Sequence, residues 1–217
     1  SDEYSPVKVN ENVPAGLCYT SATTGRPKGV IYSHRGIVLH SMMEAQHDTI
    51  GFRERDVVLP IVPMFHANCW GVPYTSAMVG ATQVLNGIRP DPEVICRLID
   101  SEKVTLSLGV PTIWIGVLDH LERSDKTYDF SSLREIVSGG SAVPISLIQA
   151  YKEKLDVNLI QAYGMTEATP VISYNRPTTV FDGNSEDEKL QLAGTQGAIV
   201  PGIEMRLVDD QGNDLPW

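Results

Sequence analysis

Residues 104–123 read "VTLSLGVPTIWIGVLDHLER", a short run rich in Val and Leu followed by a segment of helix length. The first seven residues carry no charge, which is typical of a strand that is buried in a sheet. We predict a strand over residues 104–110 and a helix over residues 111–123. A strand that leads directly into a helix is the repeating unit of an α/β fold.

Similar apolar runs stand before and after this unit, separated by segments of helix length. The predicted strands are residues 16–21, 29–34, 56–63, 81–86, 133–140 and 157–164, and the predicted helices are residues 34–50, 68–79, 91–103 and 144–155. The helix at 91–103 has the clearest beginning, with Asp91 as the cap, Pro92 in the first turn and Glu93 near the positive end of the dipole.

This order of elements predicts an α/β fold, with a sheet of mainly parallel strands covered by helices on both faces. We expect residues 170–197 to be irregular, with a charged and mobile surface loop at residues 182–191. Residues 202–213 are predicted to form a C-terminal β-hairpin.

The composition limits the class of protein. The chain has 217 residues, of which 42% are hydrophobic, and its net charge of −10 argues against a nucleic-acid-binding surface. No apolar run has the ~20 residues that a membrane span needs. Cys18, Cys69 and Cys96 have no paired spacing and indicate reduced thiols in a cytoplasmic protein.

Three loops of unusual composition each follow a predicted strand: "TSATTGRPKG" (residues 20–29), "SGGSAVP" (138–144) and "YGMTEATP" (163–170). Ligands of open α/β sheets bind at the carboxyl ends of the strands, so we expect the three loops to meet at one site. In the first loop, hydroxyl groups, backbone N–H groups and Lys28 can surround phosphate oxygens, although the Walker spacing is absent. On composition alone, a Ser/Thr-rich surface turn is an equally good interpretation.

The same loops carry a family resemblance. "YTSATTGRPKGV" (residues 19–30) resembles the phosphate-loop signature of the adenylate-forming superfamily, which includes acyl-CoA synthetases, peptide-synthetase adenylation domains and luciferases. "QAYGMTEATP" (161–170) and "GTQGAIVPGIEMRLVD" (194–209) resemble its second and third signatures. "PMFHANCWGVPYTSAMVGATQVL" (63–85) is most similar to medium- and long-chain fatty-acyl-CoA synthetases.

The resemblance implies a ligase that uses ATP, Mg²⁺ and coenzyme A. Such an enzyme converts a fatty acid and ATP to acyl-AMP and pyrophosphate, and then transfers the acyl group to the thiol of coenzyme A. Two alternatives stay open: an acyl-AMP ligase that loads a carrier protein, and a non-catalytic nucleotide-binding module.

The resemblance also implies that the sequence is a piece of the large N-terminal domain of a longer enzyme. We expect a polar leader at residues 1–12, an α/β nucleotide- and acyl-binding core at 13–197, and the start of a β-rich subdomain at 198–217. The hinge and the C-terminal lid with its catalytic lysine would follow, so we expect the isolated sequence to be inactive.

Individual residues receive roles from the resemblance. The first loop would hold the β- and γ-phosphates, Thr166 the α-phosphate and Glu167 the Mg²⁺ ion, while Tyr163 would lie on the adenine and His66 beside the substrate carboxylate. The catalytic residues would be Lys28, His66, Thr166 and Glu167. The nucleotide would contact Thr20, Ser21, Thr23, Thr24, Gly25, Lys28, Gly139, Gly140, Ser141, Gln161, Tyr163, Gly164 and Thr166. The acyl pocket would contain His66, Trp70, Gly71, Val110 and Gly164.

These roles compete with ordinary structural ones. Without the resemblance, Tyr163 would be a core aromatic residue, Glu167 a helix-start residue and Trp70 part of the core. The first loop also departs from the family pattern, because Ala22 stands where glycine is usual. An alanine that replaces a glycine of positive φ costs ~1 kcal/mol or more.

The histidines outside these loops have simpler explanations. His66 and Cys69 have no second pair of ligands nearby, so we expect no metal there. His34, His40 and His47 fall on one predicted helix, and we expect all three on its solvated face.

Overall fold

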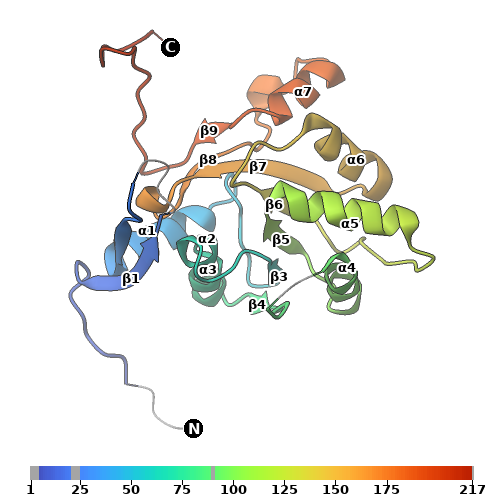
Figure 1. Cartoon of the computed structure of the whole chain (residues 1–217), viewed down its shortest axis with the longest axis horizontal. Helices are drawn as coiled ribbons and strands as arrows, with labels where there is room; N and C mark the ends of the chain where they lie inside the picture. The colour runs from blue at the N-terminus through green and yellow to red at the C-terminus, as the bar shows by residue number, and fades with distance from the viewer. Residues whose placement is uncertain (1–4, 21–24, 89–90, 217) are drawn as a thin grey trace.

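A seven-stranded sheet forms the centre of the protein (Figure 1). The structure is a computed structural model that describes residues 5–20, 25–88 and 91–216. The spatial order of the strands is β4, β3, β5, β6, β7, β8, β9. Along the chain the strands are β3 (Val57–Pro60), β4 (Thr82–Gln83), β5 (Leu106–Gly109), β6 (Glu135–Ser138), β7 (Asn158–Gly164), β8 (Val171–Tyr174) and β9 (Ala198–Ile199).

Most of this sheet is parallel. Strands β4, β3, β5, β6 and β7 are paired in parallel, whereas β8 and β9 continue the sheet in antiparallel pairing. Residues 165–170 join β7 to β8, and so short a connection can reverse the chain but cannot make a parallel crossover. The predicted α/β sheet of mainly parallel strands is confirmed, with an antiparallel edge that we had not predicted.

Helices cover both faces of the sheet. They are α1 (His34–Glu44), α2 (Ala67–Trp70), α3 (Val72–Val79), α4 (Pro92–Ser101), α5 (Pro111–Arg123), α6 (Ile145–Leu155) and α7 (Glu186–Ala193), with short 3₁₀ helices at Thr166–Ala168 and Thr179–Phe181. One apolar cluster contains Trp114 of α5 and the other contains Val72 of α3. The consecutive residues Val58 and Leu59 of β3 belong to different clusters, because side chains alternate between the faces of a strand.

Two helices lie close to the positions that the sequence predicts for them. Helix α5 spans the predicted residues 111–123. Helix α4 begins at Pro92, and the Asp91 side chain accepts a hydrogen bond from the Val94 N–H at 2.9 Å. This cap satisfies one of the N–H groups that a helix start leaves without an intrahelical partner.

The predicted helix over residues 34–50 is too long, because α1 ends at Glu44. The Thr49 hydroxyl donates to the carbonyl oxygen of Met43 at 2.6 Å, and the Gly51 N–H donates to the carbonyl of Glu44 at 2.8 Å. These donors replace the N–H groups of a continued helix, so the chain can turn away.

The predicted helix over residues 68–79 begins only at Val72. The element before it, α2, is a left-handed turn in which four consecutive residues have φ between 46° and 56°. None of the four is glycine, and left-handed helical geometry costs ~1–2 kcal/mol per such residue. Residue preferences therefore gave no sign of this turn.

The region 170–197 is not irregular, since it contains β8 and α7. Much of the supposed surface loop at 182–191 is helical. Helix α7 begins with a capping box, in which the Ser185 N–H donates to Glu188 Oε2 at 2.8 Å. Its charged sequence "EDEKLQLA" carries no apolar stripe, so the usual helical pattern was missing.

Two further β predictions were too long. Strand β4 covers only Thr82–Gln83 of the predicted residues 81–86. Between residues 202 and 216 the chain folds back in a turn, with one antiparallel bridge from Val208 to Asp214, and no strand is formed there.

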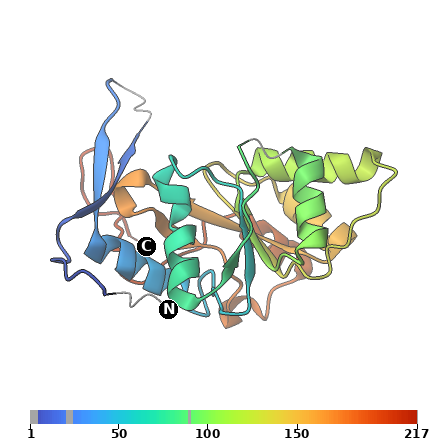
Figure 2. The ribbon, with the colours of Figure 1, turned by 90° about the horizontal axis from the view of Figure 1, so that it is seen from below.

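The first loop is carried by a separate hairpin. Strands β1 (Pro14–Tyr19) and β2 (Gly29–Ser33) pair antiparallel in a two-stranded sheet of their own. Figure 2 shows this hairpin projecting at one end of the molecule, beside α1. The loop therefore does not follow a strand of the parallel sheet as we had expected.

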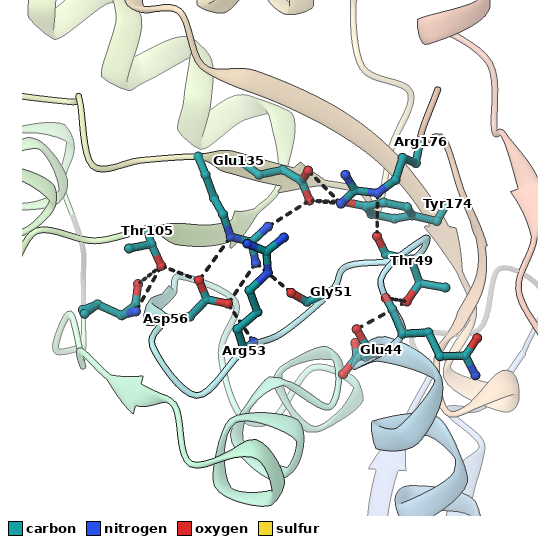
Figure 3. Close-up of polar contacts among 12 residues, drawn as sticks. Glu44, Thr49, Gly51, Arg53, Asp56, Thr105, Glu135, Tyr174 and Arg176 are labelled. Carbon is teal, nitrogen blue, oxygen red and sulfur yellow. Dashed lines mark hydrogen bonds and ion pairs between the residues drawn. The ribbon is translucent and has the colours of Figure 1, made fainter. Parts of the chain in front are cut away.

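A buried polar network ties together segments at the amino ends of the parallel strands (Figure 3). Arg134 donates to Asp56 with distances of 3.1 Å from Nε and 2.9 Å from Nη2, and Arg176 Nη2 lies 3.0 and 2.9 Å from the two carboxylate oxygens of Glu135. The Tyr174 hydroxyl also donates to Glu135. Both carboxylates are almost fully buried, so each depends on its arginine for charge compensation.

Within the described ranges, no helix combines the length and the apolar character needed to cross a bilayer.

Candidate active site

A cavity of about 780 Å³ lies at the carboxyl ends of β6 and β7. Four segments that are far apart in the sequence line it: the hairpin loop, the segment 65–70 that includes α2, the loop after β6 and the turn between β7 and β8. Eleven of the predicted site residues line this cavity, namely Thr20, Gly25, Lys28, His66, Trp70, Gly139, Gly140, Tyr163, Gly164, Thr166 and Glu167. The expected convergence of the loops is thus present, although the first loop arrives from the separate hairpin.

Four predicted residues lie away from the cavity lining. A Cβ on Gly71 would be 2.6 Å from His40 Nδ1, so Gly71 faces α1. Val110 lies behind Gly140, where its Cγ1 would be 3.4 Å from an added Cβ. Ser141 is exposed outside the lining.

Gln161 is the fourth of these residues. Its side chain is buried, and its Oε1 accepts a hydrogen bond from the Val143 N–H at 2.9 Å. It therefore braces the loop that contains Gly139 and Gly140 from inside the protein. Ser21, Thr23 and Thr24 lie outside the described residues, as does Ala22.

Several lining residues were missed by sequence reasoning. They are Tyr19, Arg26, Pro27, Phe65, Ala67, Ala162, Met165, Pro170 and Val171. Arg26 had a visible signal, because a second cation stands two residues before Lys28 in a loop proposed to hold phosphate. The apolar members had none, since only the packing of the loops brings them together.

The charges in the cavity are available to a ligand. Among the residues that the structure describes, Arg26, Lys28 and Glu167 have no ion-pair or hydrogen-bond partner for their side chains. Two cations in one cavity favour an anionic ligand. A carboxylate beside them would repel that anion unless a cation lay between the two.

The residues that line the cavity are suited to a Mg²⁺ ion between Glu167 and an anionic ligand. In proteins Mg²⁺ is usually bound by one or two carboxylates together with substrate phosphates rather than by a complete set of protein ligands. Glu167 is exposed in the cavity, and no group of three or more His, Cys, Asp or Glu side chains in the described part of the chain could hold a metal alone. Cys69 is buried and its thiol donates to the Val62 carbonyl oxygen at 2.8 Å, so it is occupied within the core.

The turn that carries Thr166 and Glu167 is closely packed. The Met165 N–H donates to the Pro170 carbonyl oxygen at 2.8 Å across the turn. A Cβ on Gly164 would lie 2.4 Å from that same oxygen, so only glycine fits at this position. The geometry of the turn is therefore fixed by its own backbone.

The left-handed turn α2 supplies the apolar wall. Ala67 and Trp70 line the cavity, and the ring of Trp70 lies 3.5 Å from where a Cβ on Gly139 would be. The same Cβ would be 2.6 Å from the Ala162 carbonyl oxygen, so glycine at 139 allows the loop after β6 to approach both. The result is a wall of ring and small apolar side chains next to the charged loops.

His40 lies behind this wall rather than on a solvated helix face, whereas His47 follows the end of α1 and is exposed. The Nε2 of His40 accepts a hydrogen bond from the Val171 N–H at 3.3 Å. Burial lowers the pKa of His40 to about 4, so the ring is neutral and can accept this bond at neutral pH.

Glu44 lies one helical turn from His40, fully buried, and accepts a hydrogen bond from the Thr75 hydroxyl. Burial raises the pKa of Glu44 to about 8, although the hydrogen bond from Thr75 opposes this shift. The carboxyl group is therefore protonated in the folded protein at neutral pH.

We expect Glu44→Gln to change the pH dependence of stability. Because the pKa of Glu44 is raised in the folded state, its contribution is fully present below about pH 4.5 and is lost as the pH rises through about 8. The free energy of unfolding of the variant, relative to wild type, should rise by up to about 1.4 kcal/mol per pH unit over this window. Denaturant unfolding of the full-length protein at pH 5, 6.5 and 8 measures the change.

Glu153→Gln on the exposed side of α6 is the matched control, because the same substitution there removes no buried carboxyl group. A difference between Glu44→Gln and wild type that stayed constant from pH 5 to pH 8 would contradict the assigned protonation state.

Comparison with known proteins agrees with this geometry. The family model described as "AMP-binding enzyme" matches residues 1–217. The chain is 44% identical to a long-chain-fatty-acid–CoA ligase of Thermus thermophilus and 46% identical to a medium-chain-fatty-acid–CoA ligase of Ectopseudomonas oleovorans, in each case over 99% of this chain. It spans 39% of the length of both relatives.

Among solved structures, a long-chain-fatty-acid-CoA ligase of Archaeoglobus fulgidus superposes with a TM-score of 0.83 at 29% identity. The match covers 99% of this chain and 42% of the other. This agreement extends from the sequence motifs to the arrangement of the strands and helices. The chain belongs to the family of AMP-binding enzymes.

Proposed function

We propose that the full-length protein carrying this chain is an ATP-dependent fatty-acid–CoA ligase. The observation that carries the proposal is that the hairpin loop and the Thr166–Glu167 turn line a single cavity with an apolar wall. The substrate carboxylate would form a bond to the α-phosphorus of ATP as the bond to the β-phosphate oxygen breaks, which gives acyl-AMP and pyrophosphate. The thiolate of coenzyme A would then displace AMP from the acyl carbon.

Both partners of the first step are anions, so the chain must chiefly align them and stabilise negative charge. Lys28, the missed residue Arg26 and Thr20 line the cavity and would contact the phosphates. Thr166 would donate to the α-phosphate, and Glu167 would be the protein ligand of Mg²⁺. When bound, this ion would neutralise charge on the phosphate oxygens.

The remaining lining residues suit the other parts of the substrates. Tyr163 has 41% of its surface exposed, within the lining of the cavity, so its ring can stack on adenine next to Gly139 and Gly140. His66 would lie beside the carboxylate of the acid. The three cysteines are buried free thiols, which supports the cytoplasm as the proposed location.

A medium- or long-chain fatty acid is the proposed acyl substrate. The wall formed by Ala67, Trp70, Ala162 and Val171 can exclude water from an alkyl chain. Each buried methylene contributes ~0.8 kcal/mol, so affinity should rise with chain length until the pocket is full. The two relatives described above are named for acids of these lengths.

The test uses the full-length protein with ATP, Mg²⁺ and carboxylic acids of increasing chain length, with acyl-AMP and acyl-CoA measured by mass spectrometry. Formation of acyl-CoA with medium or long acids supports the proposal. Accumulation of acyl-AMP that coenzyme A does not consume, but a carrier protein does, would identify an acyl-AMP ligase instead. ATP binding without formation of any acyl-AMP would support the alternative of a non-catalytic nucleotide-binding module.

A further inference from the structure

In the hairpin that carries the phosphate loop, few polar side chains of the described residues contact the rest of the protein. Its two strands form their own sheet and share no backbone pairing with the seven-stranded sheet. Over the described parts of residues 14–33, two side-chain hydrogen bonds reach the loops around the cavity. The Cys18 thiol donates to Asn68 Oδ1 at 3.1 Å, and the Tyr32 hydroxyl donates to the carbonyl oxygen of Thr166 at 2.7 Å.

The bond from Tyr32 is well protected. Tyr32 is only 3% exposed, and burial raises the pKa of its hydroxyl, so it remains a hydrogen-bond donor at all ordinary pH values. It lies in β2, four residues after Lys28, so the same short strand that leaves the phosphate loop also holds the Thr166 carbonyl.

The acceptor determines what this bond can control. The Thr166 carbonyl belongs to the peptide group that joins Thr166 to Glu167. That group is planar, so fixing the direction of its carbonyl also fixes the direction of the Glu167 N–H and the position of the Glu167 Cα. The hydrogen bond therefore relates the position of the Glu167 Cα, from which the carboxylate side chain extends, to the strand that follows Lys28.

We propose that Tyr32 is a positioning residue that sets the separation of Lys28 and Glu167 and thereby aligns the Mg–ATP complex. This inference rests on the proposed function, but it concerns a residue outside the cavity lining, which would touch neither ATP nor the fatty acid. Loss of the hydroxyl should weaken Mg–ATP alignment while leaving the acyl side of the site unchanged.

Tyr32→Phe in the full-length protein removes the hydroxyl and keeps the ring. Tyr151→Phe is a matched control, because the buried Tyr151 hydroxyl donates to the Trp114 carbonyl oxygen at 2.8 Å in the apolar cluster on the other face of the sheet. Both variants lose one buried hydrogen bond to a backbone carbonyl, so denaturant unfolding should show similar losses of stability.

Only Tyr32→Phe should change the nucleotide kinetics. We expect kcat/KM for ATP, measured by pyrophosphate release, to fall about tenfold and the Mg²⁺ concentration for half-maximal rate to rise, with KM for the fatty acid unchanged. In a Glu167→Gln background, Tyr32→Phe should change the rate less than twofold, because the group that it positions is already lost. Equal kinetic losses in the Tyr32→Phe and Tyr151→Phe variants, or additive effects with Glu167→Gln, would overturn the inference.

Calorimetric titration with ATP and Mg²⁺ measures the affinity of each variant for Mg–ATP and does not require turnover. A wild-type protein that binds Mg–ATP but forms no acyl-AMP would overturn the proposed ligase function alone, and the affinities of the two tyrosine variants would still decide the role of Tyr32. A wild-type protein that binds no Mg–ATP would overturn both.

Discussion

Glu167→Gln is expected to lower kcat/KM for ATP by about 10²- to 10³-fold, the magnitude typical of removing one group that stabilises charge in a transition state. Glutamine keeps the shape of the side chain and loses its charge. Glu167 lines the same cavity as Arg26 and Lys28, and it is the carboxylate proposed to hold Mg²⁺ there. Without it, the phosphates should meet the two cations but lack the metal that completes their neutralisation.

The measurement is pyrophosphate release by the full-length protein over a range of Mg²⁺ and ATP concentrations. Because Glu167 is exposed, the free energy of unfolding should change by less than about 0.5 kcal/mol, which separates a lost ligand from a damaged fold. Glu153→Gln, on the exposed surface of α6, should leave both quantities unchanged. Activity of the Glu167→Gln variant within twofold of wild type would remove Glu167 from the proposed site.

Glu135→Gln is expected to lower the free energy of unfolding by about 3 kcal/mol, because removal of one partner of a buried ion pair leaves the other charge uncompensated. The side chain of Glu135 is 4% exposed, and it accepts hydrogen bonds from Arg176 and Tyr174 (Figure 3). Arg176 keeps 26% of its side chain exposed, so the expected loss lies at the low end of the range for buried pairs.

An ion pair on the surface serves as the control for the loss of stability expected at the buried Glu135–Arg176 pair. Glu122 and Lys154 bridge α5 and α6 with about half of each side chain exposed, so Glu122→Gln should cost less than ~1 kcal/mol. Denaturant unfolding of both variants tests the difference. Since Glu135 begins β6 and the cavity lies at the other end of that strand, kcat of the folded Glu135→Gln protein should match wild type. Equal losses of stability in the two variants would mean that the buried network contributes no more than a surface pair.

The elements that sequence predicted well are those with a strong local signal. Helix α5 has a proline start and an apolar face, and Asp91 marks the start of α4 with a capping side chain. Helix α7 has a capping box but no apolar face, and β8 is a short strand that follows a tight turn, so neither stood out from a charged and apparently irregular region. Pairing of β8 with β7 depends on the whole sheet, which local patterns do not contain.

In the candidate site, too, the residues with a local sequence signal were predicted and the others were not. The loops containing Lys28, Gly139 and Glu167 were found because each has an unusual sequence and resembles a family signature, and the cavity joins them. The burial of His40 could not be predicted, because it depends on contact between α1 and the start of β8. Arg26 lies in the same loop but had no predicted role, since of the two cations there the family signature implies a phosphate contact for Lys28 alone.

The left-handed turn α2 has a practical consequence for anyone who redesigns the proposed acyl pocket. Trp70 is the bulky side chain to replace when more room is wanted, yet its backbone has φ of 55°. Valine, isoleucine and threonine would resist that geometry whatever their volume, whereas glycine and asparagine adopt it readily. A library at this position should therefore be ranked by backbone tolerance before side-chain size.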